Sequence, residues 1–274
     1  MCFKGNAARF RMRIILFLFM LLYVLPIVAS AAFYCLGERD TDWRSADRSS
    51  MRFLPPPQRM PGAVVRVFCA RTVSWRAIAA THSWVVIKDA GAPAYERFDY
   101  TAWGGPIWKD RFVPDGRWFG SEPELIFAAD GAEAARMIPT IRGVIHNYRY
   151  QRPGDYRLWP GPNSNTFVAA IMQAVAMKAA LPSTAVGKDF PYDGRWAGWA
   201  PSRTGVRLNL GGYLGITVGW YEGIELNLLG AVAGLDIRRA ALKLPGLGRL
   251  GFPLYSSPLS AVRDGSESDA RVRS

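Results

Sequence analysis

The longest apolar run of the chain begins near the N-terminus, where Ile14 to Gly37 carry no charged side chain. At a rise of about 1.5 Å per residue, a helix of this length can cross a bilayer core of about 30 Å. The residues before this run include four basic side chains and no acidic one, which predicts that this flank stays in the cytoplasm. The pattern therefore predicts a membrane anchor over residues 1–37, with the rest of the chain outside the cytoplasm.

A cleaved signal peptide is the competing interpretation of this run. Ala29-Ser30-Ala31 resembles the small-residue site at which such peptides are cut. The apolar run continues past that site through Phe33 and Leu36, which favours an uncleaved anchor. Cys35 follows Tyr34 and not a small residue, so the pattern is not that of a lipoprotein signal.

Beyond the anchor, the pattern changes to a polar and then proline-rich passage over residues 38–61, which predicts an extended linker. Short runs rich in Val, Ile and aromatic residues then alternate with turn residues, as in strands. We expect strands at residues 63–70, 83–88, 94–100 and 124–129. Apolar residues at helical spacing predict a helix over residues 132–148, in which Pro139 favours a kink or a late start.

The most regular alternation lies further along, where apolar residues occupy alternate positions in three runs between Val206 and Leu228. A period of two is typical of strands, so we expect a three-stranded antiparallel meander. A second membrane span over residues 208–235 is the alternative, because the whole stretch is apolar. Glu222 and Glu225 oppose that alternative, since charged groups are costly to insert into a membrane.

One stretch combines a turn with the start of a helix. Trp159-Pro160-Gly161-Pro162 enforces a turn, and Asn163-Ser164-Asn165-Thr166-Phe167 leads into a helix predicted from Thr166 to Lys178. The unpaired N–H groups and positive dipole end of a helix stabilise an anion, so nucleophiles are often placed there. On residue types alone, the simpler interpretation is that Asn163 or Asn165 caps the helix.

These residues also resemble a known family. Residues 159–167 are similar to a signature of the DUF3750 family of uncharacterised bacterial envelope proteins. The similarity includes three further motifs: Thr81-His82-Ser83-Trp84-Val85-Val86, Gly187-Lys188-Asp189-Phe190 and Val218-Gly219-Trp220-Tyr221-Glu222-Gly223. It covers most of the chain from residue 43 to the region of residue 248. The family name implies no activity.

A more distant resemblance suggests chemistry. A His at the start of a strand, followed much later by Asn-Cys-Asn-Thr-Phe at a helix start, resembles circularly permuted papain-like domains related to NlpC/P60 hydrolases and acyltransferases. The resemblance implies that His82 is the base and that Ser164, at the position of the cysteine, is the nucleophile. A third group usually orients the base. Asp99 and Tyr100 on the next predicted strand are both candidates, and the sequence does not choose between them.

The serine at this position leaves two functions open. A hydroxyl is a weaker nucleophile than a thiolate and needs an adjacent base, which His82 could supply as in other Ser-His hydrolases. Equally, the substitution is compatible with a site that binds and no longer cleaves. A catalytic site requires His82 and Ser164 within hydrogen-bond reach, and we expect the N–H groups that follow Ser164 to face an oxyanion. His146 has no motif around it and receives no role.

The composition of the chain restricts the classes of molecule that it is expected to bind. The net charge of +12 is spread along the chain and fits an anionic surface, either lipid headgroups or another envelope polymer. Nucleic acid is disfavoured, because no binding motif accompanies the charge and a membrane segment precedes the domain. Cys69 is the single cysteine after the leader and reads as a buried strand residue. No His or Cys cluster has metal-ligand spacing, so we expect neither a metal nor a cofactor.

Together these patterns predict an α+β protein: an antiparallel sheet, a helix headed by Ser164, a β-meander and an N-terminal transmembrane helix. The predicted parts are an anchor (1–37), a linker (38–61), a papain-like domain (62–204), a β-rich segment packed on it (205–255) and a disordered tail (256–274). We expect a single-pass protein of the bacterial inner (cytoplasmic) membrane. Its function is either a hydrolase or acyltransferase on an envelope amide or ester, using His82 and Ser164, or a non-catalytic, membrane-tethered binding or structural module.

Overall fold

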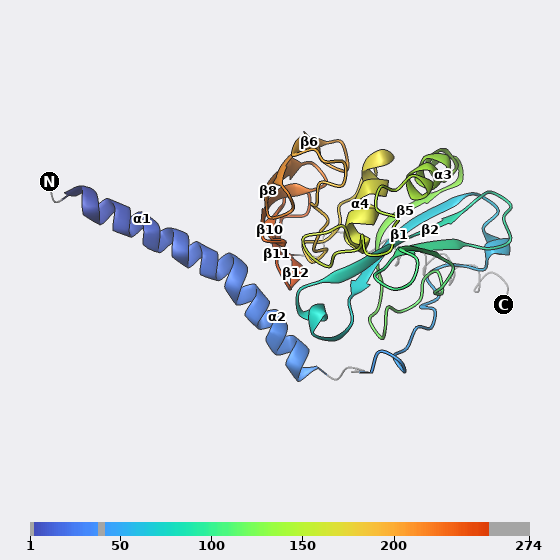
Figure 1. Cartoon of the computed structure of the whole chain (residues 1–274), viewed down its shortest axis with the longest axis horizontal. Helices are drawn as coiled ribbons and strands as arrows, with labels where there is room; N and C mark the ends of the chain where they lie inside the picture. The colour runs from blue at the N-terminus through green and yellow to red at the C-terminus, as the bar shows by residue number, and fades with distance from the viewer. Residues whose placement is uncertain (1–2, 38–41, 252–274) are drawn as a thin grey trace, which may run out of the picture.

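Two antiparallel sheets form the body of the protein, and their strands follow the alternation of apolar positions in the sequence. The computed structural model describes residues 3–37 and 42–251. The first sheet has five strands in the order β4-β3-β2-β1-β5, and the second has seven in the order β12-β11-β10-β9-β8-β7-β6. Figure 1 shows the two sheets with helix α4 between them.

The first sheet confirms the four strands predicted before residue 130 and adds a short fifth one. Its strands are β1 (Val64–Arg71), β2 (Thr81–Lys88), β3 (Glu96–Tyr100), β4 (Ile107–Lys109) and β5 (Glu124–Asp130). All its pairings are antiparallel, and Val85 of β2 lies between Val67 of β1 and Phe98 of β3. Because side chains alternate across a sheet, these three residues point to one face.

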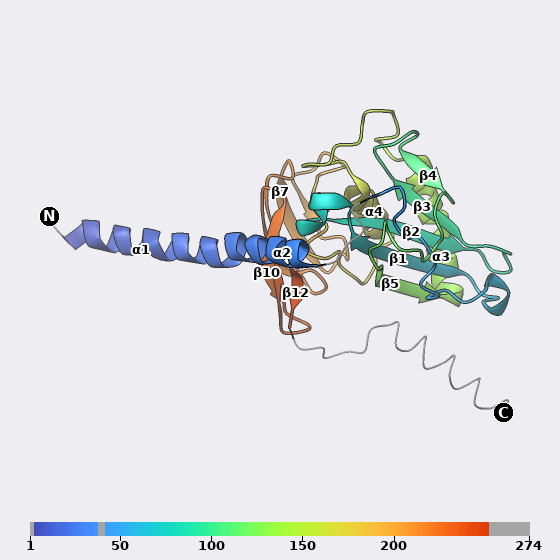
Figure 2. The same cartoon turned by 90° about the horizontal axis from the view of Figure 1, so that it is seen from below.

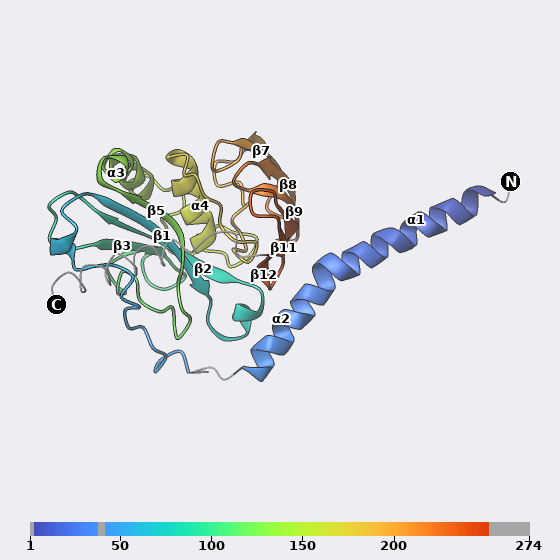
Figure 3. The ribbon, with the colours of Figure 1, turned by 180° about the vertical axis from the view of Figure 1, so that it is seen from behind.

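Two helices cover that face. They are α3 (Gly131–His146) and α4 (Ser164–Ala174), which lie along the same side of the sheet in Figures 1 and 3. Buried residues from both helices, among them Ile141 and Phe167, pack with Val67 and Val85 in the main core. The helix predicted over residues 132–148 is confirmed, and it continues through Pro139 without a late start.

The opposite face of the first sheet is covered by an aromatic cluster. Phe68, Trp84 and Trp118 are buried there, and Phe112 and Phe119 from the loop after β4 pack against them. Short 3₁₀ turns lie at Pro57–Arg59 and Ser74–Ile78. Both faces of this sheet are therefore shielded from solvent.

The second sheet is a meander in which each strand pairs with its neighbours in sequence. Its strands are β6 (Ala197–Trp199), β7 (Gly205–Leu210), β8 (Leu214–Gly219), β9 (Gly223–Leu228), β10 (Ala231–Asp236), β11 (Ala241–Leu244) and β12 (Gly248–Leu250). The predicted three-stranded meander is confirmed as β7, β8 and β9. The alternative of a second membrane span over residues 208–235 is wrong, because that stretch contains strands and turns and no helix.

One helix of the described residues, Ala8–Leu36, is long and apolar enough to cross a membrane, with 29 residues and a mean hydropathy of 2.7 over an 18-residue window. It consists of α1 (Phe3–Phe19), a π-helical turn η1 (Met20–Val24) and α2 (Leu25–Leu36), and it extends away from the body of the protein (Figure 2). Such a helix fits a single-pass membrane protein.

Part of this helix packs against the folded body. Tyr23, Pro26 and Ser30 are buried at helical spacing on one side of it. The Tyr23 hydroxyl donates to the backbone oxygen of Leu226 in β9 at 2.9 Å, and the Ser30 hydroxyl lies 3.0 Å from the backbone oxygen of Gly246. Cleavage at Ala29-Ser30-Ala31 would remove the Tyr23 contact, and the uncleaved anchor stays a prediction.

The α+β class is thus confirmed, with mixed helices and antiparallel sheets behind one N-terminal apolar helix. The predicted domain boundaries at 61/62 and 204/205 stay predictions. The predicted tail at 256–274 and part of the predicted linker, residues 38–41, lie outside the described residues.

Candidate functional site

The start of α4 is fixed by a capping box. Asn163 is the N-cap, and its Oδ1 accepts hydrogen bonds from the N–H groups of Asn165 at 3.0 Å and Thr166 at 3.1 Å. In return, Thr166 Oγ1 accepts from the N–H of Asn163 at 3.2 Å. The capping interpretation is confirmed for Asn163, and the Ser164 side chain takes no part in the cap.

The motif at residues 187–190 packs directly against this cap. Asn163 Nδ2 donates to the backbone oxygens of Leu158 and Val186, both at 3.0 Å. Gly187 has φ +87°, and a Cβ there would lie 2.2 Å from Asn163 Nδ2. Glycine is required at this position because both the backbone angle and the close approach exclude a side chain.

Asn165 fastens the start of α4 to the start of β2. Its Nδ2 donates to the backbone oxygen of Thr81 at 2.9 Å, and its Oδ1 accepts from Ser83 Oγ at 2.7 Å. Both bonds are buried, and they bind the residues on either side of His82. The head of the helix and the beginning of the strand are therefore held together by side-chain chemistry as well as by packing.

His82 belongs to a buried polar network on the first sheet. Its Nε2 lies 2.9 Å from Asp99 Oδ1 on β3. Asp99 is held in turn by Arg97, whose Nε and Nη2 donate to the two carboxylate oxygens at 2.8 and 3.0 Å. The imidazole stacks on the Trp118 ring with centroids 3.6 Å apart and an interplanar angle of 3°. Position and orientation of the His82 ring are thus set from two sides.

Burial controls the protonation of this network. Desolvation lowers the pKa of His82 below its usual 6.5, although Asp99 opposes that change. Burial alone would raise the pKa of Asp99, but the charge of Arg97 and the bond to His82 outweigh it and leave that pKa lowered. At neutral pH, His82 is therefore an uncharged imidazole beside a charged carboxylate. Since Asp99 engages Nε2, Nδ1 is the nitrogen that remains to accept a proton.

Ser164 faces the phenol of Tyr156. Burial raises the pKa of Tyr156, and hydrogen bonds from the hydroxyl and the backbone N–H of Ser164 offset part of that rise. The expectation that the N–H groups after Ser164 face an oxyanion is wrong for Asn165 and Thr166, because both donate to the Asn163 side chain. The backbone donor at the site is the N–H of Ser164 itself.

Strand alternation decides how His82 and Ser164 relate to each other. His82 and Trp84 lie on the face of Trp118, whereas Ser83 and Val85 lie on the face of α4. Among the described residues, Ser83 is bonded to the head of α4 and no hydrogen bond joins His82 to Ser164. The structure thus brings the two segments together but engages the two side chains with different partners.

Two residues of this site were left open or missed by sequence reasoning. Asp99 was one of two candidates for orienting His82, and the structure gives it that contact. Tyr100 points instead into the main core, where its hydroxyl has no hydrogen-bond partner in the described part of the chain. Tyr156 carries no sequence signal, because it lies in a turn without a pattern, and only the folded chain brings it to Ser164.

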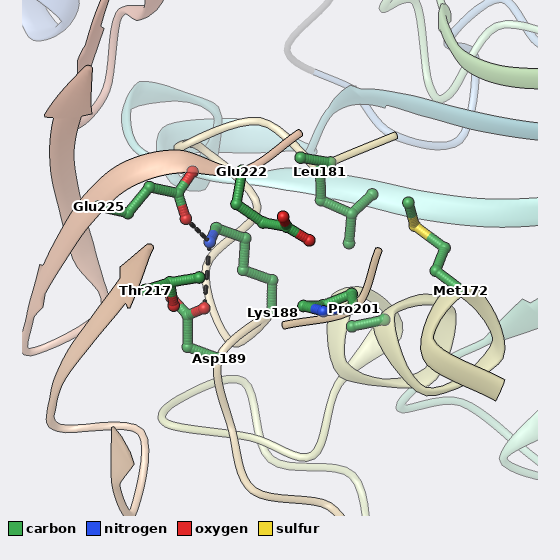
Figure 4. A pocket seen from close by; sticks show the side chains of 10 residues that line it. Met172, Leu181, Lys188, Asp189, Pro201, Thr217, Glu222 and Glu225 are labelled. Carbon is green, nitrogen blue, oxygen red and sulfur yellow. Dashed lines mark hydrogen bonds and ion pairs between the residues drawn. The ribbon is translucent and has the colours of Figure 1, made fainter. Parts of the chain in front are cut away.

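A second buried polar cluster lies where α4 meets the second sheet (Figure 4). Lys188 bonds to Asp189 and Glu225, and Lys243 donates to Glu225 Oε1 at 2.7 Å. Its neighbour Glu222 accepts from Ser202 N at 2.8 Å. The cavity beside the cluster leaves about 20 Å³ for the centre of a water molecule, which is room for one water. The cluster therefore joins the loop at residues 187–190 to strands β9 and β11 of the second sheet.

The described residues contain no group of three or more His, Cys, Asp or Glu side chains arranged to hold a metal ion. Cys69 is buried, and desolvation raises the pKa of its thiol well above the usual range, so it is not an activated nucleophile.

Comparison with known protein families gives a match to part of the chain. The model of a family described as "Protein of unknown function (DUF3750)" matches residues 62–190, which confirms the family resemblance. The match includes His82, Asp99, Ser164 and the motif at residues 187–190, and ends before the motif at residues 218–223. No curated protein and no solved structure matches the chain.

Proposed function

We propose that this chain, which carries a DUF3750 domain at residues 62–190 behind an apolar helix, is a membrane-anchored hydrolase or acyltransferase acting on an amide or ester of the cell envelope. The observation that carries the proposal is the 2.9 Å bond between His82 Nε2 and Asp99, with Asp99 itself fixed by Arg97. A base that is oriented by a buried carboxylate is the arrangement on which nucleophilic catalysis depends.

In the proposed reaction, Ser164 Oγ attacks the carbonyl carbon of the substrate while its proton passes to His82 Nδ1. The imidazolium then gives that proton to the leaving amine or alcohol as the C–N or C–O bond breaks, which leaves an acyl-Ser164 ester. Water or an acceptor hydroxyl or amine releases the acyl group. His82 and Ser164 lie on opposite faces of β2, so the proposal requires the start of β2 to rearrange when substrate binds and bring His82 Nδ1 to Ser164 Oγ.

Ser164 N–H and the Tyr156 hydroxyl are the proposed oxyanion donors. Both groups lie at the head of α4, where the helix dipole favours negative charge. Because burial raises the pKa of Tyr156, its phenol stays protonated and can donate. A substrate carbonyl oxygen would accept hydrogen bonds from Ser164 N–H and the Tyr156 hydroxyl, in place of the present bond between these two groups.

The test is labelling of the full-length protein in membranes with a serine-directed fluorophosphonate. We expect labelling of the wild type and its loss in Ser164→Ala and His82→Ala. His146→Ala is the matched control, because the second histidine is exposed on α3. Labelling should fall only as the pH drops through the lowered pKa of His82, since its imidazole must be neutral to act. Equal labelling of Ser164→Ala and wild type would refute the nucleophile.

A non-catalytic, membrane-tethered binding or structural module is the second candidate. It is favoured by the separate partners of the two side chains, Asp99 for His82 and Tyr156 for Ser164. This candidate predicts no labelling in the wild type and unchanged unfolding in Ser164→Cys, whose thiol would also stay unreactive.

The proposed location is the inner membrane, with the domain outside the cytoplasm. It is supported by the four basic residues that precede the apolar helix. Alkaline phosphatase fused after Met60 should be active and sediment with membranes. An inactive fusion would mean that the domain lies on the cytoplasmic side. A soluble, shortened product would show that the N-terminal helix is cleaved.

A further inference from the structure

The second sheet turns its apolar side chains away from the protein. Paired positions across six strands form one apolar row: Val206, Val218, Ile224, Leu235, Leu242 and Leu250. A parallel row contains Leu208, Ile216 and Leu226. These side chains are all 41–57% exposed. We call this surface the outward face.

The inward face of the same sheet is polar. Arg207, Thr217, Glu225 and Lys243 alternate with the apolar positions, point toward the rest of the protein and are buried. In water a sheet exposed on one side places its polar residues outward, so this sheet is inverted. An apolar surface of this extent on a soluble monomer marks an interaction site.

Large aromatic residues lie at the margins of the outward face. Tyr213 is in the turn between β7 and β8, Trp220 is in the turn between β8 and β9, and Trp199 is on the edge strand β6. Their exposed fractions are 45%, 57% and 62%. The outward face thus has an aliphatic centre and an aromatic margin. This arrangement is typical of protein surfaces that lie at the membrane–water interface.

The position of the N-terminal helix indicates the environment of the outward face. The helix touches the sheet at Tyr23, whose hydroxyl bonds to Leu226, and α1 extends from there away from the domain, on the side of the outward face (Figures 1 and 2). The apolar run on that side goes from Ile14 to Leu22, or nine residues, which reach about 14 Å at 1.5 Å per residue. A bilayer core is about 30 Å thick, so a bilayer crossed by this helix must extend as far as the sheet.

We propose that the outward face of the second sheet is inserted into the lipid bilayer beside the N-terminal helix, so that the protein contacts the membrane through two elements. The exposed apolar side chains of the helix next to the contact, such as Leu25 and Val28, continue the same surface. The backbone of the central strands is satisfied by pairing on both sides, as burial in lipid demands. The edge strands carry Trp199 and Arg249, which suit the interface.

The inference rests on the helix spanning a membrane and does not depend on the proposed chemistry. It also explains why residues 208–235 are apolar enough to suggest a second span. The stretch lies in lipid as one face of a sheet, while the alternate residues remain polar because they face the protein.

The test uses the full chain in phosphatidylcholine vesicles with brominated acyl chains. Cys2 and Cys35 are replaced by Ser, and the buried Cys69 is kept. Single variants Leu208→Cys and Val218→Cys carry an environment-sensitive fluorophore. Glu133→Cys on α3 is the exposed control, and Leu18→Cys marks the helix itself. We expect strong quenching by the brominated lipid at Leu208, Val218 and Leu18 and none at Glu133, with the opposite order for aqueous iodide.

The outcomes separate the inference from its premise. Quenching at Leu18 with none at Leu208 and Val218 would overturn the inference and leave the anchor intact. Absence of quenching at all four positions would overturn the membrane span. Disulfide-linked pairs of Val218→Cys at low protein-to-lipid ratio would show that a second copy covers the face, which also overturns the inference. Because these side chains are exposed, the cysteine substitutions leave the packing of the core unchanged. A melting temperature equal to that of the wild type verifies that each variant is folded.

Discussion

The two sheets of this protein use the same alternation of apolar and polar residues but bury opposite sides of it. In the first sheet, Val67 and Val85 pack under α3 and α4, and the other face is closed by the aromatic cluster around Trp118. In the second sheet, Glu225 and Lys243 face inward, while Leu208 and its neighbours face out. A period of two therefore predicts a strand without predicting which set of side chains faces the protein.

The comparison also separates two kinds of buried charge. Arg97, Asp99 and His82 lie against aromatic rings on a covered face, where they orient one imidazole. Lys188, Glu225 and Lys243 lie between the sheets, where two cations share one carboxylate. The first network leaves a ring nitrogen available for chemistry, while the second pairs its charges with each other and holds the loop at residues 187–190 on the second sheet.

The largest effect is expected when the inward face of the second sheet loses its shared anion. Glu225→Leu leaves the buried Lys243 without a counter-charge and leaves Lys188 with Asp189 alone, which should reduce the free energy of unfolding by about 3–5 kcal/mol. Denaturant unfolding in detergent measures this. Glu122→Leu is the control, because its 3.4 Å ion pair with Arg117 is exposed and such pairs contribute about 0–1 kcal/mol. Equal losses in the two variants would contradict a buried fastening role.

A matched pair of isoleucines compares the apolar sides directly. Ile87 in β2 is fully buried and Ile216 in β8 is 42% exposed. Ile87→Ala should destabilise the protein by about 2–5 kcal/mol, whereas Ile216→Ala should cost about 1 kcal/mol or less. Thermal unfolding of both variants in the same vesicles provides the measurement. A larger loss for Ile216→Ala would mean that the outward face is packed against protein.

The smallest effect is a difference in pH dependence between the two polar networks. The folded-state pKa of His82 is lowered from 6.5, so its stabilising contribution is complete above pH 6.5 and is lost as the pH falls through the lowered pKa. The pKa of Glu225 is lowered from 4.5, so its contribution is lost only below pH 4.5. His82→Phe should remove the upper step of an acid-unfolding curve and keep the lower one. Retention of both steps in that variant would assign the upper one elsewhere.

Much of the fold could be predicted from local patterns. The strands of the first sheet, helix α3 and the first part of the meander are short-range consequences of residue spacing, and the capping role of Asn163 follows from its type and place. The apolar N-terminal helix could be predicted from its length and its lack of charged residues alone. In each case the deciding interactions join residues that are close in sequence.

The candidate site could be predicted only in part. The sequence pointed to His82 and Ser164 as chemistry-bearing residues and to Asp99 as one of two possible partners. It could not predict that Tyr156 meets Ser164, or that Asn165 uses the N–H that was expected for an oxyanion. Those contacts depend on the path of the turn at residues 149–163, which no periodic pattern constrains.

The sequence by itself determined where strands and helices form, because spacing of apolar residues and capping chemistry act over a few residues. Only the tertiary structure decided which side of each sheet is covered. For the first sheet, the cover is α3 and α4 from the same domain. For the second, the polar side is drawn inward because Lys188 on a distant loop meets Glu225 and Lys243 there. Buried charges must be paired, and it is that pairing across the fold that leaves the apolar side facing out.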